Sequence, residues 1–82
     1  MCRMQVHLRD VKPHDEISSV SLGPHRSWTH VLRDANGGTV NVRGLKVKSN
    51  TTDLNTWKVK LCDGTVLRLP FSYVWVRIIR PL

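Results

Sequence analysis

Apolar and positively charged side chains alternate one for one in two segments, Leu45-Lys46-Val47-Lys48 and Trp57-Lys58-Val59-Lys60-Leu61. Successive side chains of a β-strand point to opposite faces of its sheet, so this alternation predicts strands with one apolar and one cationic face. We expect the apolar residues to enter a core and the lysines to line the other surface. A surface of this kind suits an anionic ligand.

Strand-like segments recur along the whole chain, and no longer segment keeps the period of a helix. They span residues 4–9, 17–22, 27–33, 39–48 with a bend at Gly44, 57–61, 65–69 and 73–79. Six or seven short strands in 82 residues fit a small SH3-like or OB-like barrel, because a flat sheet would leave long edges unpaired. The predicted fold is an all-β single domain over residues 1–82, with at most a turn or two of helix.

Two connections between these segments can be predicted from their composition. Asn36-Gly37 indicates a two-residue type I′ hairpin turn, since both central positions of that turn need a positive φ. Residues 49–55 are polar apart from Leu54 and are expected to form an exposed loop.

The second segment and the turn before it carry two further signals. Its alternation slips by one residue between Ile17 and Val20, as a β-bulge requires. The stretch from Val11 to Ile17 is similar to the Val-x-Pro-Gly-Asp-x-Ile turn of many unrelated small barrels, with His14 where glycine is usual. That likeness implies a turn and no function.

The chain is strongly basic, with 13 Lys and Arg against six Asp and Glu and a net charge of +7. Residues 43–82 hold eight basic and two acidic residues, a net of +6, whereas residues 1–42 hold five and four, a net of +1. Such an asymmetry predicts an anion-binding surface in the second half. The residues expected to make that contact are Arg43, Lys46, Lys48, Lys58, Lys60, Arg68 and Arg77.

Nucleic acid is the anion that this surface favours. Lysines two apart on a strand are separated by about 6.6 to 6.8 Å, which spans about two phosphates of one DNA strand. The chain has three Trp, one Tyr and one Phe, which is few for stacking unpaired bases, so duplex DNA is favoured over RNA. We expect a small DNA-binding accessory or regulatory protein. Two alternatives stay open: a protein-interaction module, such as a phage- or plasmid-type factor, that docks an acidic partner protein through the same face, and a merely solvated face.

The last segment is apolar on both faces. Val74 and Val76 share one face, and Trp75 and Ile79 share the other. Each face of such a strand must be covered: one face packs against the core, and the other needs a second copy of the chain or a partner. Tyr73, Trp75 and Ile79 are therefore candidate interface residues, for a homodimer, a partner or a purely structural assembly.

Spacing argues against metal, cofactor and catalysis. Cys2 and Cys62 stand alone, and the close pair His25 and His30 has no matching cysteine pair. No phosphate-binding glycine loop or nucleophile–base arrangement is present, so we expect neither a cofactor nor an enzyme. The longest apolar stretch, residues 73–79, is far shorter than the about 20 residues of a membrane-spanning helix, and no export signal opens the chain. A cytoplasmic protein without membrane contact is expected.

Overall fold

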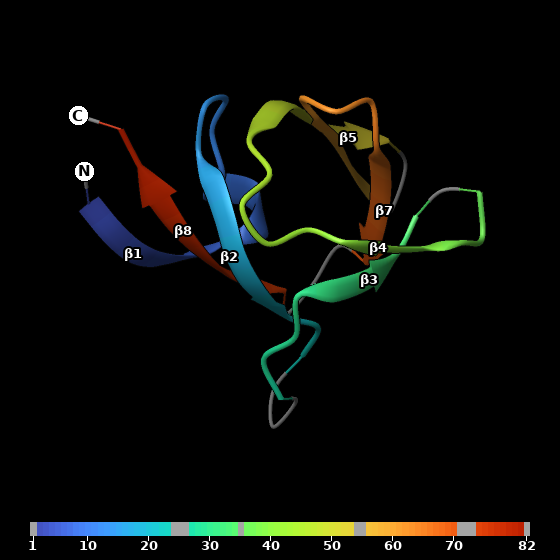
Figure 1. Ribbon diagram of the computed structural model, residues 1–82, viewed down its shortest axis with the longest axis horizontal. Coiled ribbons are helices and arrows are strands. Elements are labelled where there is room, and N and C mark those ends of the chain that lie inside the picture. Colours follow the sequence, from blue (N-terminus) through green and yellow to red (C-terminus); the bar gives the residue numbers. More distant parts are fainter. Residues whose placement is uncertain (1, 24–26, 35, 54–55, 71–73, 82) are drawn as a thin grey trace.

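The computed structural model describes residues 2–23, 27–34, 36–53, 56–70 and 74–81. They form eight strands and one turn of 3-10 helix, η1 (Leu8–Asp10) (Figure 1). The strands are β1 (Cys2–His7), β2 (Glu16–Ser21), β3 (Val31–Arg33), β4 (Thr39–Asn41), β5 (Val47–Asp53), β6 (Thr56–Leu61), β7 (Val66–Pro70) and β8 (Trp75–Arg80).

The strands pair into three small antiparallel sheets, in the orders β1-β8-β2, β3-β4 and β5-β6-β7. The predicted all-β fold class is therefore confirmed, with one strand more than expected. Isolated bridges join the sheets at the edge of β2, where Glu16 pairs with Lys46 and Val20 pairs with Thr29. Closure of these sheets into an SH3-like or OB-like barrel stays a prediction. No helix in the described ranges is long and apolar enough to cross a membrane.

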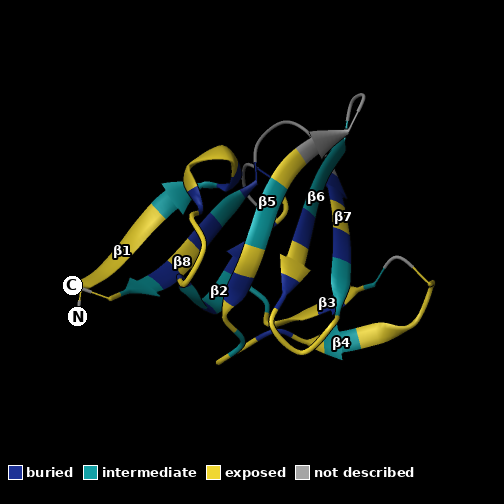
Figure 2. Ribbon diagram, turned by 90° about the horizontal axis from the view of Figure 1, so that it is seen from above, coloured by how far each residue is buried: buried dark blue, intermediate teal, exposed yellow. Residues whose placement is uncertain are grey.

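A single hydrophobic core lies between the sheets, as the burial colours of Figure 2 show. Its buried members are Leu8, Val11, Ile17, Val20, Leu32, Val42, Val47, Val59, Leu61, Leu67, Leu69, Val74, Val76 and Ile78. The alternation in the two lysine-bearing segments predicted this correctly for Val47, Val59 and Leu61. Leu45 and Trp57 are half-buried and pack against the same core.

Both signals around the second segment are confirmed. The pairing of β2 with β8 shifts register between Ile17 and Ser19, which is the expected bulge. In the preceding turn, the N–H of Asp15 donates to the carbonyl of Lys12 at 3.1 Å, and His14 has a φ of 76°. A positive φ at the third position of a turn is typical of type II and favours glycine, so His14 accepts a strained conformation here.

The two predicted connections are wrong. Residues 49–53 belong to β5, where Asn50 pairs with Val59 and Thr51 with Lys58, while residues 54–55 lie outside the described ranges. The turn at Asn36-Gly37 is longer than two residues, because the last pair of the β3–β4 hairpin is Arg33 with Thr39.

Asp34 explains the longer hairpin loop. Its Oδ1 accepts hydrogen bonds from the backbone N–H groups of Asn36 and Gly38, both at 2.9 Å. A carboxylate that bonds the backbone ahead of it organises a turn in place of the strand ladder. Within the described residues of this loop, Gly37 alone has a positive φ, of 87°.

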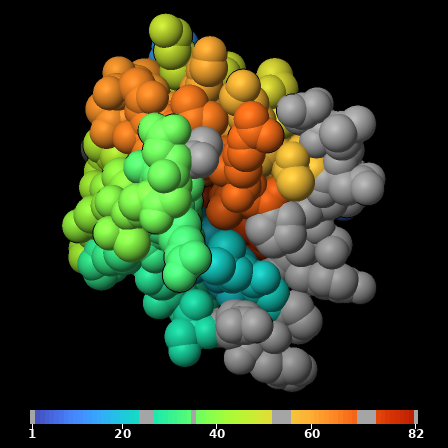
Figure 3. Space-filling model, turned by 90° about the vertical axis from the view of Figure 1, so that its right-hand side faces the viewer, coloured from blue at the N-terminus to red at the C-terminus, as the bar shows by residue number. Residues whose placement is uncertain are grey.

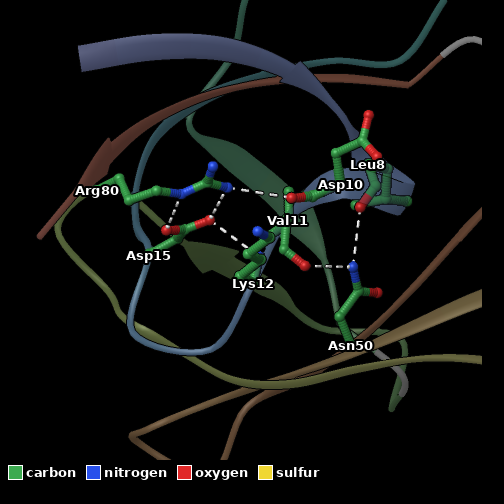
Figure 4. A network of polar contacts seen from close by, with 7 residues as sticks. All are labelled: Leu8, Asp10, Val11, Lys12, Asp15, Asn50 and Arg80. Atoms are coloured by element: carbon green, nitrogen blue, oxygen red, sulfur yellow. Dashed lines mark hydrogen bonds and ion pairs between the residues drawn. The ribbon is translucent and has the colours of Figure 1, made fainter. Parts of the chain in front are cut away.

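A polar network joins residues 8–15 to Arg80 at the end of β8 and to Asn50 of β5 (Figure 4). Asp15 is 1% exposed, and its carboxylate accepts hydrogen bonds from Arg80 Nε at 2.9 Å and from an Arg80 terminal nitrogen at 2.8 Å. Asn50 Nδ2 donates to the carbonyls of Leu8 at 2.8 Å and Val11 at 2.9 Å. These contacts join segments 65, 42 and 39 residues apart in the sequence, so the network holds the sheets in place.

Candidate nucleic-acid interface

Basic side chains gather on the outer face of the β5-β6-β7 sheet. In the ladder, Lys58 lies directly opposite Arg68, and Lys60 lies opposite Val66. The residues between them, Val59 and Leu67, are buried in the core, so the two lysines and Arg68 share the outward face. Directly opposed side chains of antiparallel strands have Cβ atoms about 4.5 to 5.5 Å apart, so Lys58 and Arg68 hold two positive charges close together.

A register shift between Val47 and Ser49 brings Lys48 into the same region. Lys48 and Lys60 both line a hollow of about 370 Å³ at the turn after β6. We call Lys48, Lys58, Lys60 and Arg68 the cationic face. Among the side chains that the structure describes, the sole ion pair within 4.0 Å joins Arg80 to Asp15, so no described carboxylate pairs with a member of the cationic face.

One carboxylate lies at the rim of this hollow. The N–H of Thr65 donates to Asp63 Oδ1 at 2.9 Å, and this hydrogen bond holds the pKa of Asp63 below its ordinary value of 3.8. Asp63 is therefore ionised at neutral pH, and its negative charge would repel an anion at this end of the cationic face.

Lys46 stands apart from the cationic face. It forms the isolated bridge with Glu16, and its carbonyl accepts the N–H of Cys62 at 2.8 Å. Residues paired in this way lie side by side, so Glu16 offsets part of the positive charge of Lys46.

Arg77 belongs to another sheet, β1-β8-β2, and Arg43 lies beside that sheet. Arg77 lies in the middle of β8, opposite Gln5 of β1, with its guanidinium carbon 4.0 Å from the centre of the Trp28 ring. Arg43 lies in the turn beside β2, where the N–H of Gly44 donates to the carbonyl of Ile17 at 2.8 Å. Both arginines line a groove of about 590 Å³ over β1-β8-β2. The seven residues predicted to share one surface are thus divided: four form the cationic face, Arg43 and Arg77 line the groove, and Lys46 lies beside Glu16.

Arg3 also lines this groove, and the sequence prediction omitted it. The sequence contained a signal for this, because Arg3 and Gln5 alternate with the apolar Val6 and so point to the opposite, outward face of the first strand. The prediction omitted Arg3 because it compared the net charges of the two halves of the chain, and the first half is nearly neutral.

The proposed interface on β8 is partly covered by the chain itself. Trp75 is half-buried, and its ring lies 3.8 Å from the ring of His7, centre to centre, with a tilt of 31°. Ile79 is half-buried and lines the groove. Tyr73 lies outside the described residues. A homodimer or partner contact through these residues stays a prediction.

Figure 3 shows β7, in orange, on the side of the molecule where the green β3–β4 hairpin lies beside it. Arg68 of β7 is exposed. Among the described side chains, no three of His, Cys, Asp or Glu lie close enough together to hold a metal ion.

Comparison of the chain with protein-family models, with curated proteins and with solved structures found no match.

Proposed function

We propose that this protein binds the phosphate backbone of a nucleic acid, duplex DNA above all, through the cationic face. The observation that supports this function best is the direct opposition of Lys58 and Arg68 across β6 and β7, with Lys60 two residues further on the same face. Like charges opposite each other cost the free protein about 0.2 to 1 kcal/mol per pair. A phosphate placed between them turns that repulsion into attraction.

The spacing of the face also supports a backbone contact. Lys58 and Lys60 are separated along the strand by about 6.8 Å, and neighbouring strands lie about 4.8 Å apart. The face therefore presents a two-dimensional array of charges, in which the two lysines of β6 span about two phosphates of one DNA strand. Trp57 has the inward parity of Val59 and packs against the core, so it offers no stacking platform beside the lysines.

A titration of fluorescent random-sequence duplex DNA tests the proposal. The double variant Lys58→Glu with Lys60→Glu is expected to abolish binding. A matched control, Arg9→Glu with Arg33→Glu, makes the same change in net charge at exposed positions outside the cationic face and is expected to weaken binding far less. If four phosphates are neutralised, log K should fall with log salt at a slope of about −3.6.

Two outcomes would contradict the proposal. Equal losses in the double variant and the control would show that net charge, and no particular face, attracts DNA. Wild-type protein that fails to bind DNA but forms a complex of defined stoichiometry with an acidic protein would favour the interaction-module alternative.

A further inference from the structure

The groove over β1-β8-β2 is a second candidate anion site, separate from the cationic face. We call it the arginine groove, after Arg3, Arg43 and Arg77. Its floor is β8, where Ile79 lies between Arg3 of β1 on one side and Glu16 of β2 on the other. Together with the turn at Arg43-Gly44, four separate segments thus line one hollow of about 590 Å³.

The groove is rich in guanidinium groups that lack carboxylate partners. Within the part of the chain that the structure describes, neither Arg3, Arg43 nor Arg77 forms an ion pair, although Glu16 lines the same groove. Guanidinium groups bind phosphate through paired N–H donors in a fixed plane. Arg77 is also held in place by its contact with the Trp28 ring, so less side-chain freedom is lost when it binds.

The size of the groove favours a small ligand over a duplex. Its volume lies within the roughly 300 to 1,000 Å³ typical of small-molecule sites. Three arginines and one glutamate give the lining a charge of +2, and Lys46 beside Glu16 adds a further positive charge, so the groove suits a ligand with one or two phosphates. A run of backbone phosphates would meet Glu16 as well as the arginines, and that carboxylate repels them.

Glu16 and Ile79 indicate what the remainder of the ligand is. A carboxylate accepts hydrogen bonds from hydroxyl or amino groups, and Ile79 supplies an apolar surface beside it. A ligand with a phosphate at one end and hydrogen-bond donors on a flat or sugar-like body meets both requirements. We propose that the arginine groove binds a nucleotide carrying one or two phosphates, with its phosphate on the arginines and its nucleoside hydroxyl or amino groups on Glu16.

Calorimetric titration with ADP, pyrophosphate and adenosine tests the site. We expect ADP to bind one site per chain and adenosine to bind at least tenfold more weakly. Arg3→Ala and Arg43→Ala should each weaken ADP at least tenfold, the scale of one charge-assisted hydrogen bond. Arg68→Ala removes an exposed arginine of the cationic face and should change ADP affinity less than twofold.

Glu16→Gln separates the two halves of the proposal. It removes a negative charge next to the arginines, so pyrophosphate should bind more tightly, while ADP should gain less because its nucleoside loses a strong acceptor. Equal gains for both probes would overturn the role of Glu16, and the absence of saturable ADP binding would overturn the site. A far-ultraviolet circular dichroism spectrum shows that each variant remains folded.

The outcome is independent of the proposed DNA contact. Lys58→Glu with Lys60→Glu should leave ADP affinity unchanged, whatever it does to DNA binding. If instead saturating ADP displaced DNA from the wild-type protein, the groove would be part of the DNA surface and the separate nucleotide site would be refuted.

Discussion

The contact between Arg80 and Asp15 allows the sharpest test of the fold. Arg80→Met keeps an unbranched apolar side chain but removes both Arg80 donors to Asp15, so that the buried carboxylate keeps only the N–H of Lys12 at 2.9 Å among its described donors. Hydrogen bonds to charged groups contribute about 1.5 to 3 kcal/mol each. The Arg80 side chain is 26% exposed, so solvent screening places its two bonds at the lower end, and we expect a loss of about 3 kcal/mol at pH 7.

The loss should depend on pH in a defined direction. Burial by itself raises the pKa of Asp15, but the hydrogen bond from Arg80, the N–H of Lys12 and the charges of both residues outweigh it, so the pKa lies below 3.8. A carboxyl whose pKa is lowered by folding stabilises the native state above its unfolded pKa and loses that contribution as pH falls through the folded pKa. The same hydrogen bond raises the pKa of Arg80, which stays charged throughout.

In Arg80→Met the buried carboxylate keeps one donor, so burial raises its pKa and acid relieves the destabilisation. Urea denaturation of wild type and variant from pH 7 to about pH 2.5 should show the difference in unfolding free energy shrinking toward the acid end. Arg68→Met, at an exposed position without an ion pair among the described residues, is the matched control. A difference under about 1 kcal/mol at pH 7, or one that does not change with pH, would refute the reasoning.

Two further predictions concern the two connections whose structure the sequence analysis predicted incorrectly. Asn50→Ala should cost about 1 to 3 kcal/mol in urea denaturation, because the carbonyls of Leu8 and Val11 lose a donor, and Asn50→Asp should cost more, since it faces both carbonyls with a carboxylate; equal costs would contradict the assigned bonds. Gly37→Val should lower stability by about 1 to 2 kcal/mol, because a φ of 87° strains a β-branched residue although no atom lies within 4 Å of its Cβ position; an unchanged melting temperature would refute this.

The alternation of apolar and polar residues correctly predicted features that depend on which side chains of a single strand face the core. The inward residues Val47, Val59 and Leu61 and the bulge after Ile17 follow from which side chain occupies each face. The same rule placed Lys58 and Lys60 together, since i and i+2 on one strand share a face whatever surrounds the strand.

The prediction failed where a polar side chain replaces the packing that defines a strand. Asn50 occupies an inward position of β5 and uses it for two hydrogen bonds, so the segment lacks the apolar residue that would have marked it. Asp34 likewise uses its carboxylate to build a loop at a position where Asn36-Gly37 suggested a tighter turn. Both residues act through partners that sequence spacing does not identify.

The predicted basic surface is divided for a similar reason, because sequence spacing does not identify how the sheets are arranged. Whether Arg77 lies beside Lys58 depends on how the sheets are arranged, and both sheets direct their inner faces into one core. Their outer faces therefore point away from the core that lies between them. The predicted basic residues are therefore divided between separate surfaces, so under our two proposals a nucleotide bound in the arginine groove would leave the cationic face free to bind DNA.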